Sequence, residues 1–179
     1  MVKVGDKLPA GTLFEYIEVE GEGCSLGPNA FDIAKSTAGK TIALFGLPGA
    51  FTPTCSTFQL PGFEKSASEM ADLGVDDIYC LSVNDSFVMN QWAKSQKLEA
   101  VKVIPDGSGA FTDAVGMMVR KDNLGFGPRS WRYAAIIDDG VVEAVFEEPG
   151  RCDDHPEDPY GESSPENVLN YLRERSQAA

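Results

Sequence analysis

Histidine and closely spaced cysteines are what this sequence lacks. Its only histidine is His155, and its four cysteines, which are Cys24, Cys55, Cys80 and Cys152, form no Cys-x-x-Cys pair. Zinc sites and disulfide-exchange centres both need such closely spaced ligands or thiols. The sequence therefore argues against a metal site, a bound cofactor and a disulfide scaffold. One or two reactive thiols among inert ones is the better interpretation.

Basic residues and long apolar runs are also scarce. Lysine and arginine total 15 against 28 acidic residues, which gives a net charge of −13. A surface this acidic repels phosphate backbones and anionic lipid, so neither nucleic acid nor a membrane is an expected partner. The longest apolar stretches, such as 41–47, have the length of a strand and are too short to span a bilayer. Residues 1–6 show no apolar run behind a basic start, so we expect a cytoplasmic protein.

Hydrophobic patterning predicts one domain over residues 1–179. The chain has 179 residues and 42% are hydrophobic, which is enough for a full apolar core. Short apolar runs predict strands at 13–19, 40–46, 78–83, 101–105, 133–137 and 141–146. Helical periodicity and cap residues predict helices from Thr52 or Pro53 to Gly74, from 84–86 through 92, over 109–118 and from 163–166 onward.

The order of these elements predicts the fold class. Strand–helix alternation is followed by two apolar runs that flank Asp139-Gly140, a strong hairpin signal, and by a closing helix. This order favours an α/β fold with a mixed central sheet and helices on both faces. A thioredoxin-like sandwich satisfies it. A flavodoxin-like sheet also fits the first half of the chain.

The most informative segment runs from Pro48 to Ser56, between a predicted buried strand and a predicted helix. If the helix begins near Thr52 or Pro53, Cys55 lies in its first turn. There, free backbone N–H groups and the helix dipole stabilise an anion, and the thiolate is the nucleophilic form of cysteine. Thr52 lies three residues earlier, so its hydroxyl can donate to the sulfur or hold a peroxide oxygen. Pro53 fixes the backbone and leaves no competing donor.

The same segment resembles the active site of peroxiredoxins, a family of the thioredoxin superfamily. Pro48, Thr52 and Cys55 match the Pro-x-x-x-Thr-x-x-Cys signature of that family. The longer string 48–56 is similar to the type-five redoxin subfamily, and the resemblance continues through 60–63, 80–85, 129–133 and 139–142. It implies a thiol peroxidase that reduces hydrogen peroxide and organic hydroperoxides through a sulfenic acid on Cys55.

The resemblance also implies a catalytic arginine. The family's arginine directly precedes the strand that ends in the acidic turn, and here that residue is Arg132, with Arg129 as the second candidate. A guanidinium beside Cys55 favours the thiolate and can bond a peroxide oxygen as charge builds. The plain alternative for Arg132 is a surface salt bridge to the acidic C-terminal region.

The sequence departs from the subfamily at two positions. Gln59 stands where many members carry a histidine, four residues after the nucleophile. Cys152 is the one candidate for a resolving cysteine, but Asp153 and Asp154 beside it disfavour an attacking thiolate. We therefore favour a one-cysteine mechanism in which glutathione, glutaredoxin or thioredoxin supplies the second thiol. A peroxide sensor or thiol relay with slow turnover is the alternative function.

The remaining residues of note have plain structural interpretations. Cys80 lies in an apolar strand and is expected to be an inert buried thiol, Cys24 to be incidental and His155 to be a solvated loop residue. The segment 152–163 is expected to be an exposed loop. The resemblance implies a homodimer, for which four apolar residues either supply the interface or fill the core: Phe51, Phe87, Met117 and Met118.

Overall fold

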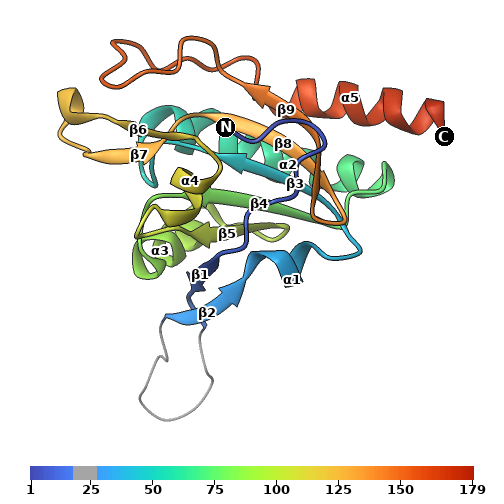
Figure 1. Cartoon of the computed structure of the whole chain (residues 1–179), viewed down its shortest axis with the longest axis horizontal. Helices are drawn as coiled ribbons and strands as arrows, with labels where there is room; N and C mark the ends of the chain where they lie inside the picture. The colour runs from blue at the N-terminus through green and yellow to red at the C-terminus, as the bar shows by residue number, and fades with distance from the viewer. Residues whose placement is uncertain (18–27) are drawn as a thin grey trace.

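The centre of the molecule is a five-stranded sheet with the strand order β5-β4-β3-β8-β9 (Figure 1). The computed structural model describes residues 1–17 and 28–179. The sheet strands are β3 (Thr41–Gly46), β4 (Asp77–Ser82), β5 (Val101–Pro105), β8 (Tyr133–Asp138) and β9 (Val141–Glu147). β3 is fully buried, as expected for a run of apolar residues at the middle of a sheet.

The sheet is mixed, as the sequence predicted. β3, β4 and β5 are parallel, whereas β8 pairs antiparallel with both β3 and β9. This pairing and the helices on both faces confirm the thioredoxin-like fold. It excludes the flavodoxin-like alternative, because β8 and β9 form an antiparallel hairpin on one side of β3. Asp139 (φ 47°) and Gly140 (φ 76°) form that hairpin's turn, where both central residues need the left-handed region.

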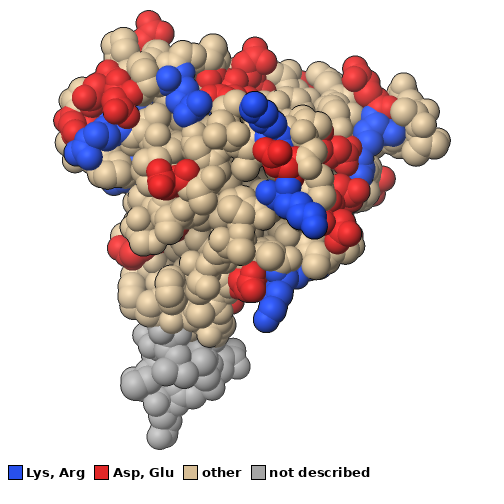
Figure 2. Space-filling view, viewed as in Figure 1, with Lys and Arg blue, Asp and Glu red and all other residues tan. Residues whose placement is uncertain are grey.

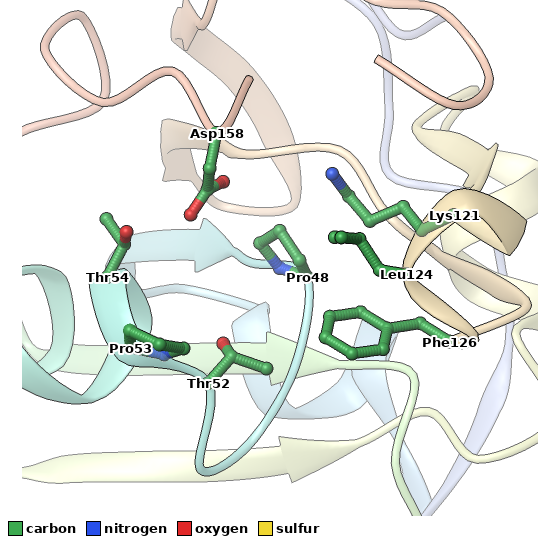
Figure 3. Close-up of a pocket in the computed structure, with 8 residues that line it drawn as sticks. All are labelled: Pro48, Thr52, Pro53, Thr54, Lys121, Leu124, Phe126 and Asp158. Carbon is green, nitrogen blue, oxygen red and sulfur yellow. The ribbon is translucent and has the colours of Figure 1, made fainter. Parts of the chain in front are cut away.

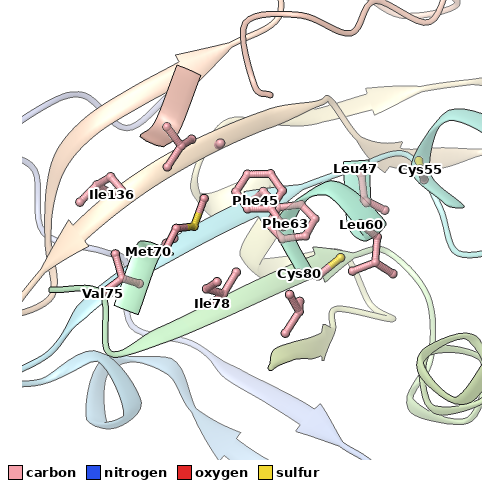
Figure 4. Packing of buried hydrophobic residues seen from close by; sticks show 14 of the residues in the cluster. Phe45, Leu47, Cys55, Leu60, Phe63, Met70, Val75, Ile78, Cys80 and Ile136 are labelled. Carbon is pink, nitrogen blue, oxygen red and sulfur yellow. The ribbon is translucent and has the colours of Figure 1, made fainter. Parts of the chain in front are cut away.

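Two apolar clusters lie on opposite faces of the sheet. The first packs α2 (Leu60–Asp72), α3 (Ser86–Gln96) and α5 (Pro165–Ala178) against one face. Figure 4 shows its centre, where the rings of Phe45 on β3 and Phe63 on α2 stack with centroids 4.0 Å apart. The second packs α1 (Ile33–Thr37), α4 (Ala110–Ala114) and the N-terminal segment against the other face. The first cluster matters here because it contains Cys55.

The helix ends follow the predicted cap residues. Asp85 accepts a hydrogen bond from the N–H of Val88 at the start of α3 (2.9 Å). Ser164 accepts one from the N–H of Asn167 at the start of α5 (3.3 Å). These side chains satisfy N–H groups that a helix cannot bond internally. None of the helices in the described ranges is both long and apolar enough to cross a bilayer.

Several expected elements were wrong in extent. The early strand predicted at 13–19 is β1 (Thr12–Glu15), which pairs with an unpredicted β2 (Asn29–Asp32). The helix predicted over 109–118 ends with α4 at Ala114, because the chain turns at Gly116 (φ 76°) and enters β6 (Met118–Arg120). β6 pairs with β7 (Pro128–Ser130) across a short 3-10 turn, Asp122–Leu124. Val19 and Cys24 lie outside the described residues. That residues 1–179 form a single domain stays a prediction.

Candidate active site

Cys55 lies where β3 leaves the sheet and the next helix begins. After β3 the chain passes through Phe51, which has a positive φ of 62°, and helical structure starts at Pro53. Cys55 is therefore in the first helical turn, and its side chain is fully buried. The sequence did not predict that Cys55–Gln59 is a π-helical turn, closed by the N–H of Leu60 on the carbonyl of Cys55. Such wide turns recur at functional sites because they redirect the side chains of a helix.

The structure places Arg132 beside the sulfur of Cys55. Arg132 immediately precedes β8, is only 1% exposed and donates from Nη1 to Cys55 Sγ over 3.4 Å. Burial works against the charge of Arg132, but the neighbouring Cys55 thiolate and Asp158 raise its pKa above the ordinary value. The simple surface salt bridge considered for Arg132 was wrong in its location, because the guanidinium lies inside the protein.

Every N–H group of the Arg132 guanidinium has an acceptor. Nη1 donates to Cys55 Sγ and to Gln59 Oε1 (2.6 Å). Nη2 donates to both carboxylate oxygens of Asp158 (2.7 and 2.8 Å), and Nε donates to the Pro159 carbonyl (3.2 Å). A guanidinium has five donors, so this set is complete. A peroxide oxygen that bonds Arg132 must displace one acceptor, and Asp158 is the most exposed of them, with a side chain 41% accessible.

A buried chain of hydrogen bonds holds Gln59 in place. Its Nε2 donates to Ser163 Oγ (3.3 Å), and the Ser163 hydroxyl donates to Glu148 (3.2 Å). Glu148 is 2% exposed and also accepts the backbone N–H groups of residues 161–163. These bonds fix the amide of Gln59 with its oxygen towards Arg132. The segment after β9 is therefore tied to Cys55. The exposed loop expected over 152–163 is correct for Asp158, which is exposed, and wrong at Ser163, which is buried.

Thr52 is half-buried and lies at the edge of the site. Its hydroxyl donates to the carbonyl of Gly49 (2.7 Å), and this is the one hydrogen bond that the hydroxyl forms with the described residues. A hydroxyl has a single proton but two lone pairs, so the Thr52 oxygen remains able to accept a hydrogen bond. The N–H of Ser56 donates to the Thr52 carbonyl (3.0 Å), which fixes Thr52 against the first helical turn.

Arg129 supports the loop that carries Pro48. Its Nη1 donates to the Pro48 carbonyl and its Nε to the Phe126 carbonyl, each over 3.2 Å. A Cβ atom on Gly49 would lie 2.5 Å from Nη1, so this glycine permits the contact. Burial lowers the pKa of Arg129, and the charge of Cys55 partly offsets that effect. The charge of Cys55 therefore acts on both arginines, but it is Arg132 that donates a hydrogen bond to the sulfur.

A cavity of about 320 Å³ opens in front of this site. Figure 3 shows its lining: Pro48, Thr52, Pro53, Thr54, Lys121, Leu124, Phe126 and Asp158. Thr52 and Thr54 flank the turn that leads to Cys55, whereas Lys121, Leu124 and Phe126 come from the segment between β6 and β7. The cavity can therefore bring a small molecule to the start of the Cys55 helix.

The other cysteines and the histidine differ from Cys55. Cys80 on β4 is fully buried in the same apolar cluster, and burial raises its pKa well above the ordinary value. Cys152 is exposed, and Cys55, Cys80 and Cys152 are all free thiols. His155 is only partly exposed, because its ring packs edge-on against Trp131 with centroids 5.4 Å apart. His155 is thus a loop residue, as the sequence predicted, but it is only partly solvated.

Comparison with known proteins places this site in a family. Residues 3–160 match the protein family described as Redoxin. The chain is 60% identical over 152 residues to a peroxiredoxin of Rhizobium etli, covering 82% of this chain and 85% of that one. It is similar to the structure of reduced Prx3 from Vibrio vulnificus in complex with hydrogen peroxide (TM-score 0.85, 35% identity, 98% of each chain).

A further solved structure agrees with this assignment. The antioxidant protein of Plasmodium falciparum, a 1-Cys peroxiredoxin, superposes with a TM-score of 0.89 at 33% identity and covers 95% of this chain and 99% of that one. The matched region contains the Cys55 segment, the Arg132 strand and the whole central sheet. The chain therefore belongs to the peroxiredoxin family and is a thiol-dependent peroxidase.

Proposed function

We propose that Cys55 is the residue that attacks the peroxide, and that hydrogen peroxide and organic hydroperoxides are its substrates. The observation that carries this proposal is the 3.4 Å contact from Arg132 Nη1 to a fully buried sulfur beside an open cavity. The thiolate attacks the terminal peroxide oxygen, the O–O bond breaks, and sulfur becomes a sulfenic acid. Water or an alcohol leaves with a proton. The hydrogen peroxide complex of the Vibrio vulnificus protein supports the choice of substrate.

Arg132 and Thr52 assist this step from two sides. Arg132 favours the thiolate form of Cys55. When the peroxide displaces Asp158 from the guanidinium, Arg132 donates to the oxygen that becomes negative as the O–O bond breaks. Thr52 offers an oxygen lone pair that accepts the peroxide proton, so the peroxide is oriented with its terminal oxygen at the sulfur. Pro48 and Arg129 hold the backbone that presents Thr52.

Two serine variants test the assignment of Cys55. We expect Cys55→Ser to abolish peroxide consumption in the presence of a thiol donor, because an alcohol at this site is a far weaker nucleophile. The matched variant Cys80→Ser retains turnover, since that thiol lies in the apolar core on β4. Turnover close to the wild-type value in Cys55→Ser would end the proposal.

A thiol from another molecule completes the cycle in this proposal. Cys152 is exposed, and its neighbour Asp153 is engaged with the backbone N–H of Arg120 (2.8 Å), so the segment of Cys152 is attached to β6. We therefore propose a one-cysteine mechanism with glutathione, glutaredoxin or thioredoxin as the reductant. The similarity to a 1-Cys peroxiredoxin supports it.

Mass spectrometry after peroxide treatment tests the one-cysteine mechanism. Without added thiol, we expect Cys55 as a sulfenic or over-oxidised species and no internal disulfide. Addition of glutathione is then expected to give a mixed disulfide on Cys55. A Cys55–Cys152 disulfide in the first sample would contradict the mechanism.

Slow reduction would instead favour a peroxide sensor or thiol relay. One observation favours this alternative: the Cys55 side chain is fully buried, which hinders a bulky thiol reductant more than a small peroxide. Steady-state kinetics with glutathione, glutaredoxin and thioredoxin separate the two functions. Multiple turnovers with any of them favour the peroxidase, and none with all three favours the sensor.

We further propose a cytoplasmic homodimer. Phe51 and Phe87 are 56% and 53% exposed, so they are available at an interface, whereas Met117 is fully buried and belongs to the core. Met118 is partly buried. In Figure 2, acidic side chains gather at the top of the view, whereas the surface over β1 and α3 carries few charges. Analytical ultracentrifugation of Phe87→Asp against wild type tests this interface, with dissociation to a monomer expected.

A further inference from the structure

Lys121 is a buried cation in the cavity beside the active site. It follows β6, is only 3% exposed and lines the cavity together with Leu124, Phe126 and Asp158. Its ammonium lies 5.6 Å from the centre of the Trp131 ring. Figure 3 shows that the side chain extends towards the open space between Leu124 and Asp158.

No carboxylate within the described ranges forms an ion pair with this ammonium. Lys40 and Lys102, by comparison, are both exposed and both bonded to Asp77. Asp158 lines the same cavity, but both of its carboxylate oxygens accept from Arg132 Nη2. Burial of a charge without an anionic partner is costly, and the aromatic ring offsets only part of that cost. The charge of Lys121 is therefore available to an anion that enters the cavity.

The other residues that line the cavity indicate the size and polarity of the rest of such a ligand. Pro48, Pro53, Leu124 and Phe126 give the cavity mainly apolar surfaces. The volume, about 320 Å³, is at the small end of ligand sites. Thr52 and Thr54, which lie just before Cys55 in the sequence, are on one side of the cavity, and Lys121 lies on the other (Figure 3). A ligand that fits this arrangement is small, has an apolar body and carries an anionic group at one end.

We propose that the cavity binds organic hydroperoxides that carry a carboxylate, and that Lys121 binds the carboxylate. The body of the substrate packs against Leu124 and Phe126, and the peroxide group reaches Thr52 and the Cys55 sulfur. The thiolate forms a bond to the terminal oxygen, the O–O bond breaks, and the alkoxide takes a proton to leave as a hydroxy acid. This inference rests on the proposed role of Cys55 and adds a substrate class to it.

A matched pair of substrates tests the role of Lys121. We compare kcat/KM for a carboxylate-bearing alkyl hydroperoxide with that for its methyl ester, in wild type and in Lys121→Met. Loss of a charge-assisted hydrogen bond is expected to lower kcat/KM for the acid roughly tenfold. The ester and hydrogen peroxide are expected to react as in wild type. Lys65→Met, which removes an equal charge from an exposed position on α2, is the control and is expected to leave the ratio of acid to ester unchanged.

A binding experiment separates this proposal from the chemistry of Cys55. The corresponding hydroxy acid, which has no peroxide group, is titrated against Cys55→Ser while tryptophan fluorescence is recorded, because Lys121 lies over Trp131. Saturable binding is expected, and its loss in Cys55→Ser/Lys121→Met supports the proposal. Binding that survives this loss of charge overturns it, even if Cys55 is the nucleophile. If Cys55→Ser still turns over peroxide, the assignment of Cys55 as the nucleophile is wrong, but the binding experiment still tests the role of Lys121.

Three further results would each contradict the proposal. The first is an equal loss for acid and ester in Lys121→Met, which indicates a structural role through Trp131. The second is a failure of Lys121→Arg, which keeps the charge, to retain the preference for the acid. The third is an effect of Lys121→Met confined to the KM for glutathione, measured at saturating hydrogen peroxide. That last result would assign the ammonium to an acidic thiol reductant instead of the hydroperoxide.

Discussion

Cys55 and Cys80 are two thiols of one apolar cluster in opposite chemical environments. Both are fully buried. Cys80 lies within β4, where burial raises its pKa well above the ordinary value, so the thiol stays neutral. Cys55 lies at a helix start and receives a hydrogen bond from Arg132. Burial alone therefore makes a cysteine inert, and a directed cation within the same core is what distinguishes the candidate nucleophile.

The cation near Cys55 is itself held by residues far away in the sequence. Gln59 comes from the π-helical turn, whereas Asp158 and Pro159 come from the segment between β9 and α5. Within the described residues Cys80 has no such set of donors. Burial is the largest cause of its raised pKa, the charge of Cys55 acts in the same direction, and the charge of Arg132 opposes both. The effect of Arg132 on a nearby thiol therefore depends on a direct hydrogen bond more than on general proximity, because the strength of a hydrogen bond falls steeply with distance and angle.

Removal of the cation should make Cys55 resemble Cys80. In Arg132→Gln we expect the rate of peroxide reaction to fall roughly 100- to 1,000-fold, because the thiolate and the leaving oxygen both lose a charged donor. The rate is measured by stopped-flow fluorescence under single-turnover conditions. Arg120→Gln, which removes an exposed arginine paired with Asp122, is the control and should react normally. A normal rate in Arg132→Gln would show that the position of Cys55 at the helix start is enough for a fast peroxide reaction without Arg132.

Removal of one hydrogen bond that positions the Arg132 guanidinium should lower the rate of the peroxide reaction less than removal of Arg132 itself. Gln59→Leu keeps the volume of the side chain but removes the acceptor for Arg132 Nη1 and the donor to Ser163. We expect a roughly tenfold slower peroxide reaction, since one charged hydrogen bond that positions the guanidinium is lost. Ser163→Ala breaks only the second bond and should cost less. Equal rates in Gln59→Leu and wild type would mean that Asp158 and Pro159 position Arg132 without help.

The smallest effect concerns Cys80 and alkaline pH. Because its pKa is raised in the folded state, the stability that Cys80 contributes is present below the ordinary thiol value of 9.0 and is lost as the pH rises above it. Cys80→Ala should therefore show a shallower loss of stability than wild type between neutral and alkaline pH, with normal peroxide turnover. Urea denaturation at several pH values measures this. Parallel curves for the two proteins would indicate that Cys80 does not titrate differently in the folded state.

Tyr171 also contributes to the loss of stability at alkaline pH, and its contribution must be separated from that of Cys80. Burial and its hydrogen bond to Glu143 raise the pKa of Tyr171 to about 12, from an ordinary value of 10.0. The same sign applies, so its contribution to stability is lost as the pH rises from about 10 to about 12. The effect of Cys80 therefore shows most clearly below pH 10, where Tyr171 is protonated in both states.

Local features of the sequence predicted much of the fold and half of the site. The strand of residues 41–46, the Asp139-Gly140 hairpin and the caps of α3 and α5 each depend on neighbours within a few residues. The position of Cys55 in a first helical turn is equally local. Such features are encoded by hydrophobic period, turn chemistry and capping, which act over short stretches of chain.

The sequence by itself determined the candidate nucleophile, the strand that presents Arg132 and the mixed sheet between them. Only the tertiary structure decided that Asp158, Ser163 and Glu148 complete the surroundings of Arg132. It also decided that Lys121 faces the cavity and has no anionic partner among residues 1–17 and 28–179. These contacts join residues up to 104 positions apart. They follow from how β9, α5 and the β6–β7 connection pack around the sheet, and no local pattern of charge or period encodes that packing.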